Sequence, residues 1–115
     1  MNNEIVPVEL DYRDLVETYG SPLLVLDQAA VRKQYRALVK ALPGVRMHYA
    51  LKPLPHSAVV ATLKAEGCCF DLATNGEVDL MLENQINPDD CIHTHPIKRD
   101  GDIRYALEYG CKVFV

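Results

Sequence analysis

Short apolar runs recur about every 21 to 23 residues after residue 45, and amphipathic segments lie between them. The runs predict strands at 46–51, 68–72, 91–94 and 112–115. The segments between them predict helices that begin near Ser57, near Asn75 and at Arg99 or Asp100. Strands that alternate with helices at this spacing favour a parallel sheet with right-handed crossovers. Such α/β units build either an open doubly wound sheet or a closed (β/α)8 barrel, for which this chain supplies four of the eight units.

The residues before this repeat predict a lead-in segment. A short helix follows the cap Asp11, an apolar strand spans Leu23–Leu26, and a second helix covers about 28–42. At its other end the chain stops within the apolar run 112–115, without a cap, a turn or a polar tail. We therefore expect the chain to be the N-terminal part of a longer protein.

Composition argues against several classes of function. Apolar residues make up 49% of the chain and charged residues 24%, and the net charge is −4 with acids and bases interspersed. No basic surface for nucleic acid or for membrane lipid is expected from this pattern. No apolar run approaches the ~20 residues of a membrane span, and the N-terminus does not resemble a signal peptide, so we expect a cytoplasmic protein. The four cysteines form no CxxC pair, which favours buried free thiols.

Polar residues gather where the predicted strands end. Parallel strands end at one edge of a sheet, and α/β folds build their sites there. Lys52 stands at the end of the first strand, just before Pro53, while Asp71 and the stretch 93–96 follow from the next two strands. An amine at this edge can form a Schiff base with an aldehyde, or it can be an ordinary solvated lysine. Asp71 can hold that amine protonated, or it can serve as a loop carboxylate or cap.

Other residues at the same edge have structural explanations as well as chemical ones. Asn75 is predicted as a helix cap, and Glu77 lies in the first helical turn, where its charge complements the helix dipole. His93 and His95 are spaced to share a strand face and to reach one metal ion. Because no further cluster of ligands accompanies them, we expect no metal site.

Three ordered motifs resemble the pyridoxal-phosphate decarboxylases with an alanine racemase-like barrel, which act on ornithine, lysine, arginine and diaminopimelate. The motifs are Tyr49–Lys52 followed by Pro55 and His56, then Phe70–Glu77, then His95–Lys98 followed by Asp102–Ala106. The third resembles a strand-to-helix junction of the family. The resemblance runs from about Leu23 to the end of the chain, and three motifs in order are more specific than any one of them.

The resemblance implies a role for each of four residues. Lys52 forms the Schiff base with pyridoxal 5'-phosphate, and Ala50 packs close to the cofactor ring. Asp71 lies beside the lysine, and Glu77 supports the site. The implied reaction is the decarboxylation of a small amino acid, as in polyamine biosynthesis, by a homodimeric enzyme.

The resemblance also implies a division of the chain. Residues 1–44 supply a lead-in helix, one strand of a second, β-rich domain and a linking helix, and residues 45–115 supply the first four barrel strands with their helices. Leu54 stands where the family usually has asparagine, so we do not expect the substrate or cofactor contacts that the family makes through this side chain. The family's phosphate site, its acidic partner for the pyridine nitrogen and the partner subunit's substrate-binding residues correspond to sequence after residue 115, so we expect this chain alone to be inactive.

Two alternatives to a decarboxylase remain within the same fold. One is a non-catalytic, decarboxylase-like protein that binds and regulates a partner. The other is a racemase-type protein that also uses pyridoxal phosphate. The motif Phe70–Glu77 favours the decarboxylase.

Overall fold

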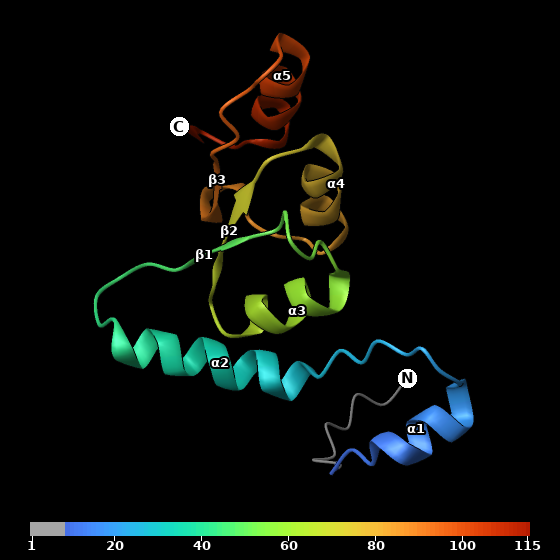
Figure 1. Ribbon diagram of the computed structural model, residues 1–115. Coiled ribbons are helices and arrows are strands. Elements are labelled where there is room, and N and C mark those ends of the chain that lie inside the picture. The colour runs from blue at the N-terminus through green and yellow to red at the C-terminus, as the bar shows by residue number, and fades with distance from the viewer. Residues whose placement is uncertain (1–8) are drawn as a thin grey trace.

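The computed structural model describes residues 9–115, so the start of the predicted lead-in, residues 1–8, lies outside the described residues. Its elements are α1 (Tyr12–Tyr19), α2 (Gln28–Ala41), β1 (His48–Ala50), α3 (Ser57–Ala65), β2 (Cys69–Leu72), α4 (Asn75–Glu83), the 3-10 helix η1 (Pro88–Asp90), β3 (Cys91–His93), α5 (Asp100–Tyr109) and β4 (Val113–Phe114) (Figure 1). The predicted alternation of strands and helices after residue 45 is confirmed. Within the described residues, no helix combines the length and the apolar character needed to cross a bilayer.

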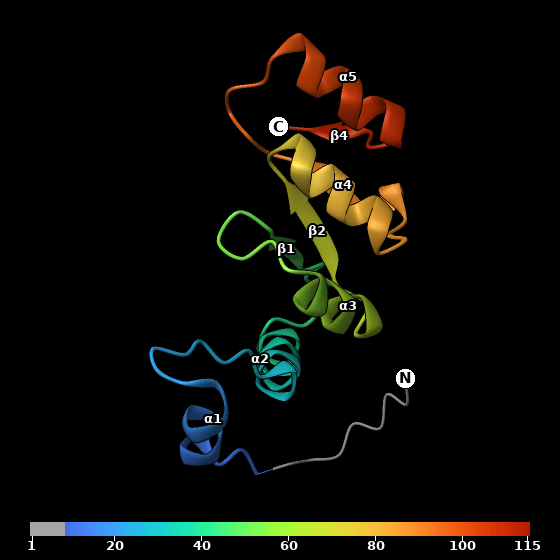
Figure 2. The same ribbon diagram turned by 90° about the vertical axis from the view of Figure 1, so that its right-hand side faces the viewer.

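The four strands form one parallel sheet in the chain order β1-β2-β3-β4. Each crossover therefore moves one strand further in the same direction. Because such connections are right-handed, they place α3, α4 and α5 on the same face of the sheet (Figure 2). A doubly wound sheet reverses direction and carries helices on both faces. The structure thus favours the barrel-type arrangement over the doubly wound one and confirms the predicted parallel βα units.

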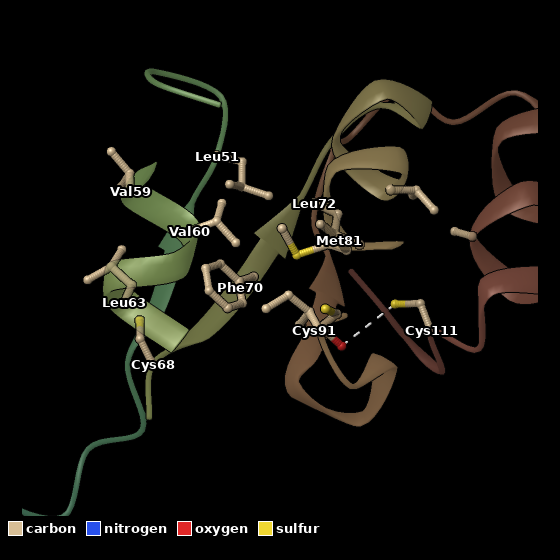
Figure 3. Packing of buried hydrophobic residues seen from close by; sticks show 13 residues of the cluster. Leu51, Val59, Val60, Leu63, Cys68, Phe70, Leu72, Met81, Cys91 and Cys111 are labelled. Atoms are coloured by element: carbon tan, nitrogen blue, oxygen red, sulfur yellow. Dashed lines mark hydrogen bonds between the residues drawn. The ribbon is translucent and has the colours of Figure 1, made fainter. Parts of the chain in front are cut away.

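Alternation along β2 separates the two faces of the sheet. Phe70 and Leu72 are buried under the helices, where Val60 of α3 and Met81 of α4 pack in the same cluster (Figure 3). Asp71, between them, points to the opposite face because successive strand residues alternate. The helix-covered face is therefore apolar, and the face without a described helix presents the carboxylate.

The predicted strand Leu23–Leu26 is wrong for the described chain. These residues form no regular element, and the side chain of Leu24 is fully exposed. A strand requires a second backbone to complete its hydrogen bonds, and no described segment pairs with residues 23–26. An apolar run alone cannot supply that partner. The assignment of this segment to a second domain stays a prediction.

All four cysteines are free and buried, as predicted. Cys68 and Cys69 lie on opposite faces. The Cys68 Sγ lies 3.7 Å from the Met47 carbonyl oxygen within the helix-covered cluster. The Cys69 Sγ accepts a hydrogen bond from Arg46 Nε at 3.0 Å. Their thiols therefore cannot act as one pair.

Candidate active site

Lys52 lies at the carboxyl end of β1, as the sequence predicts. The Leu51 N–H donates to the Asp71 carbonyl oxygen at 3.3 Å, which extends the β1–β2 ladder by one residue. The chain then turns, and the Leu54 N–H donates to the Leu51 carbonyl oxygen at 3.1 Å. Pro53 prevents the ladder from continuing because it has no N–H. The exposed side chain of Lys52 therefore stands at the rim of the sheet.

Tyr49 anchors this turn from within β1. Its hydroxyl donates to the Leu54 carbonyl oxygen at 3.2 Å, and burial raises the pKa of that hydroxyl. The phenol thus remains a protonated donor at neutral pH. Leu54, which replaces the family's usual asparagine, contributes backbone groups to the turn while its side chain is exposed.

Asp71 lies beside the strand that carries the lysine. In the ladder it pairs with Ala50 of β1 and with Ile92 of β3. Ala50 is exposed, and its single methyl group leaves open surface next to the Asp71 side chain. Lys52, two residues beyond Ala50, makes no ion pair with any residue between 9 and 115. The register thus brings Ala50, Lys52 and Asp71 to one corner of the sheet, with the amine unpaired there.

The sequence places Thr94 at this edge within the stretch 93–96 but assigns it no role of its own. Its hydroxyl oxygen lies 2.7 Å from Oδ1 and 2.8 Å from Oδ2 of Asp71. One signal could have found it: Thr94 follows two residues after Ile92, the ladder partner of Asp71, so all three share a face. Recognising that signal requires the strand register, which the sequence does not state.

Glu77 is buried, and its carboxylate serves the turn between β2 and α4. It accepts hydrogen bonds from the N–H groups of Ala73 and Thr74, the latter at 3.0 Å. The Thr74 hydroxyl accepts the Glu77 N–H at 3.2 Å, which completes a capping box. The prediction of Asn75 as the cap is therefore wrong: Thr74, with an extended backbone, precedes the helix, and Asn75 is its first residue. The Asn75 side-chain amide donates instead to Asp102 at 3.3 Å.

His93 and His95 have separate surroundings. His93 is buried, and its ring stacks on Phe114 with 5.6 Å between the ring centroids. Burial lowers the pKa of His93, and the positive charges of Lys98 and His95 lower it further. The His95 Nδ1 lies 2.7 Å from the carbonyl oxygen and 3.1 Å from the amide nitrogen of Ile97. Among residues 9–115, no three histidine, cysteine or acidic side chains gather as metal ligands.

The comparison with protein families decides what this corner belongs to. Residues 28–115 match the family model described as "Pyridoxal-dependent decarboxylase, pyridoxal binding domain". The chain belongs to this family. Pyridoxal phosphate is the family's cofactor, and a structure of SrLDC in complex with PLP and cadaverine superposes on this chain with a TM-score of 0.85 at 25% identity, covering 99% of this chain and 30% of that one.

Further relatives of this decarboxylase domain are named for closely related substrates. The diaminopimelate decarboxylase of Methanothermobacter thermautotrophicus is 32% identical over 109 residues, which is 91% of this chain and 26% of that protein. The structure of the lysine/ornithine decarboxylase from Vibrio vulnificus, complexed with cadaverine, is 61% identical with a TM-score of 0.86, and the match covers 90% of this chain and 28% of that one. The decarboxylase domain therefore spans about a quarter of the length of these relatives.

The chemistry of the corner suits this cofactor. Pyridoxal phosphate carries an aldehyde and a flat ring, and the corner offers a primary amine at Lys52 that is exposed and unpaired among the described residues. Ala50 supplies a small side chain on the surface beside it, and Asp71 supplies a carboxylate on the same face. These three residues fit the aldehyde end of the cofactor.

Proposed function

We propose that this decarboxylase domain is the N-terminal part of an enzyme that decarboxylates a basic amino acid, with ornithine and lysine as the first candidates. The proposal depends above all on one observation: a lysine without an ion-pair partner among residues 9–115 stands at the carboxyl end of β1, beside the ladder pair Ala50–Asp71. The 61% identity to a lysine/ornithine decarboxylase supports the choice of substrates over arginine and diaminopimelate.

Each residue of the corner receives a role in this proposal. Bound pyridoxal phosphate supplies an electron sink for the electrons that remain on the substrate when CO2 leaves. Lys52 attaches the cofactor aldehyde through its amine, and Ala50 leaves space for the ring. Asp71 supplies a carboxylate on the face that carries the amine, and its negative charge can stabilise a positive charge that develops at the site during the reaction. Glu77 supports the site by fixing the turn that follows Asp71.

The proposal extends to assembly and compartment. The resemblance to the family supports a homodimer whose partner subunit completes the substrate site. The cytoplasm is the proposed compartment because all four cysteines are buried free thiols, and a reducing environment keeps them so.

The first test is covalent trapping in the complete polypeptide that carries these residues. Pyridoxal phosphate is added, the protein is reduced with borohydride, and peptide mass spectrometry locates the cofactor. We expect the label on Lys52, its loss in Lys52→Ala and its retention in Lys33→Ala, an exposed lysine of α2. A label spread equally over surface lysines would refute the assigned role of Lys52.

The second test measures CO2 release from ornithine, lysine, arginine and diaminopimelate. We expect ornithine or lysine to be the preferred substrate and Lys52→Ala to lose the activity. A trapped cofactor without CO2 release from any of the four would instead indicate a binding or regulatory protein. Interconversion of amino-acid enantiomers would indicate a racemase.

A further inference from the structure

Thr94 directly follows β3 and continues its ladder. Its N–H donates to the Leu72 carbonyl oxygen at 3.2 Å. Leu72 pairs with His93, and both are buried on the helix-covered face. Because strand residues alternate, the side chain of Thr94 lies on the opposite face, together with Asp71. A backbone bond therefore fixes the position from which the Thr94 hydroxyl reaches the carboxylate.

The contact between the two side chains is nearly symmetric. The hydroxyl oxygen is 2.7 Å from one oxygen of Asp71 and 2.8 Å from the other. A hydroxyl has one proton to donate, and an ionised carboxylate accepts it in a short, charge-assisted bond. Since both oxygens lie at nearly equal distances from the hydroxyl oxygen, the carboxylate group faces Thr94. No other side chain within residues 9–115 donates to Asp71.

Asp71 contacts Thr94 and not the amine of Lys52 in the described part of the chain. Lys52 lies two residues beyond Ala50, the ladder partner of Asp71, yet it forms no ion pair with this carboxylate. An ion pair would hold the amine protonated, and a protonated amine has no electron pair with which to attack an aldehyde. A carboxylate held by Thr94 leaves the amine available while its charge stays nearby.

We propose that Thr94 is the positioning residue of the cofactor site, whose hydroxyl holds the Asp71 carboxylate away from Lys52 so that the amine can attach the cofactor. The inference rests on the proposed function, because it takes Lys52 as the attaching residue. Thr94 acts only through Asp71.

The test measures the rate at which the cofactor-free complete polypeptide takes up pyridoxal phosphate on Lys52, read as borohydride-trapped peptide over time. Thr94→Val removes the hydroxyl at nearly constant shape, and Thr94→Ser keeps it. We expect Thr94→Val to slow attachment roughly ten-fold, the equivalent of one hydrogen bond to a charged group, and Thr94→Ser to stay near the wild-type rate. Asp71→Asn and the double variant Thr94→Val/Asp71→Asn complete a cycle.

The cycle separates positioning from packing. If Thr94 acts through Asp71, its replacement has no further effect once Asp71→Asn is present, whereas independent structural damage would add. Additive effects, or an unchanged rate in Thr94→Val, would overturn the inference and leave the proposed function intact. Failure of the wild-type protein to attach the cofactor at Lys52 would overturn both. Unfolding midpoints are compared for every variant, and Thr94→Ala replaces Thr94→Val if the latter does not fold.

Discussion

The buried carboxylate of Glu77 gives a prediction whose size follows from its contacts. It accepts hydrogen bonds from the backbone N–H groups of Ala73 and Thr74, and its own N–H donates to the Thr74 hydroxyl. Glu77→Ala removes the Oε2 oxygen that accepts both bonds and leaves the N–H groups of Ala73 and Thr74 without partners. We therefore expect the turn between β2 and α4 to open far more often in this variant.

The expected change in the opening equilibrium follows from the free energy that such hydrogen bonds contribute. A hydrogen bond to a charged group contributes about 1.5 kcal/mol at the low end, so two contribute about 3 kcal/mol. Since 1.4 kcal/mol corresponds to a factor of ten, Glu77→Ala should raise the opening equilibrium by about 100-fold. Because both bonds go to the same oxygen, the amide oxygen of Glu77→Gln can accept both as neutral bonds of about 1 kcal/mol each, which leaves a loss of about 1 kcal/mol and an expected factor of about 5.

Amide hydrogen exchange measures this opening at the residues concerned. The exchange of the Ala73 and Thr74 N–H groups should accelerate in the order wild type, Glu77→Gln, Glu77→Ala, because both exchange through local opening. Glu83→Ala is the matched control, since it removes an exposed carboxylate from the last turn of the same helix. Unchanged exchange at Ala73 and Thr74 in Glu77→Ala, or equal acceleration in Glu83→Ala, would refute the capping role.

Two further predictions concern the chain as a whole. In the unfolded chain His93 becomes protonated below about pH 6.5, whereas burial and the charges of Lys98 and His95 lower the pKa of the folded residue. The stability that neutral His93 contributes is therefore present above pH 6.5 and is lost as the pH falls toward the folded pKa. Urea unfolding between pH 7.5 and 5 should show a smaller loss in His93→Phe, and an identical slope in the two proteins would contradict this assignment. The isolated chain should associate, because β1 and β4 each have a partner on one side only in the described residues and the sheet face that carries Asp71 has no covering helix. A single monomeric species in analytical sedimentation would show this reasoning to be wrong.

Local sequence patterns predict the helices and strands correctly where the described chain also contains the segments that pair or pack with them. The helices α3, α4 and α5 and the strands between them follow from apolar periodicity. The apolar run Leu23–Leu26 does not form the predicted strand, because a strand needs a second backbone to pair with and the periodicity of one segment does not reveal whether that backbone is present. The N-cap of α4 was misplaced by one residue, because Thr74 and Asn75 are both good caps and the reciprocal bonds with Glu77 decide between them.

An apolar run followed by Pro53 was enough to place Lys52 at the carboxyl end of a strand, and the motifs that contain Lys52, Asp71 and Glu77 were enough to suggest the family that the comparison shows. The contacts among the polar groups could not be obtained in this way, because they depend on how the strands pair. Thr94 and Asp71 are 23 residues apart, and their contact exists because the parallel register of β2 and β3 places both on the helix-free face. Register is a property of paired strands, so no local pattern in either strand determines it.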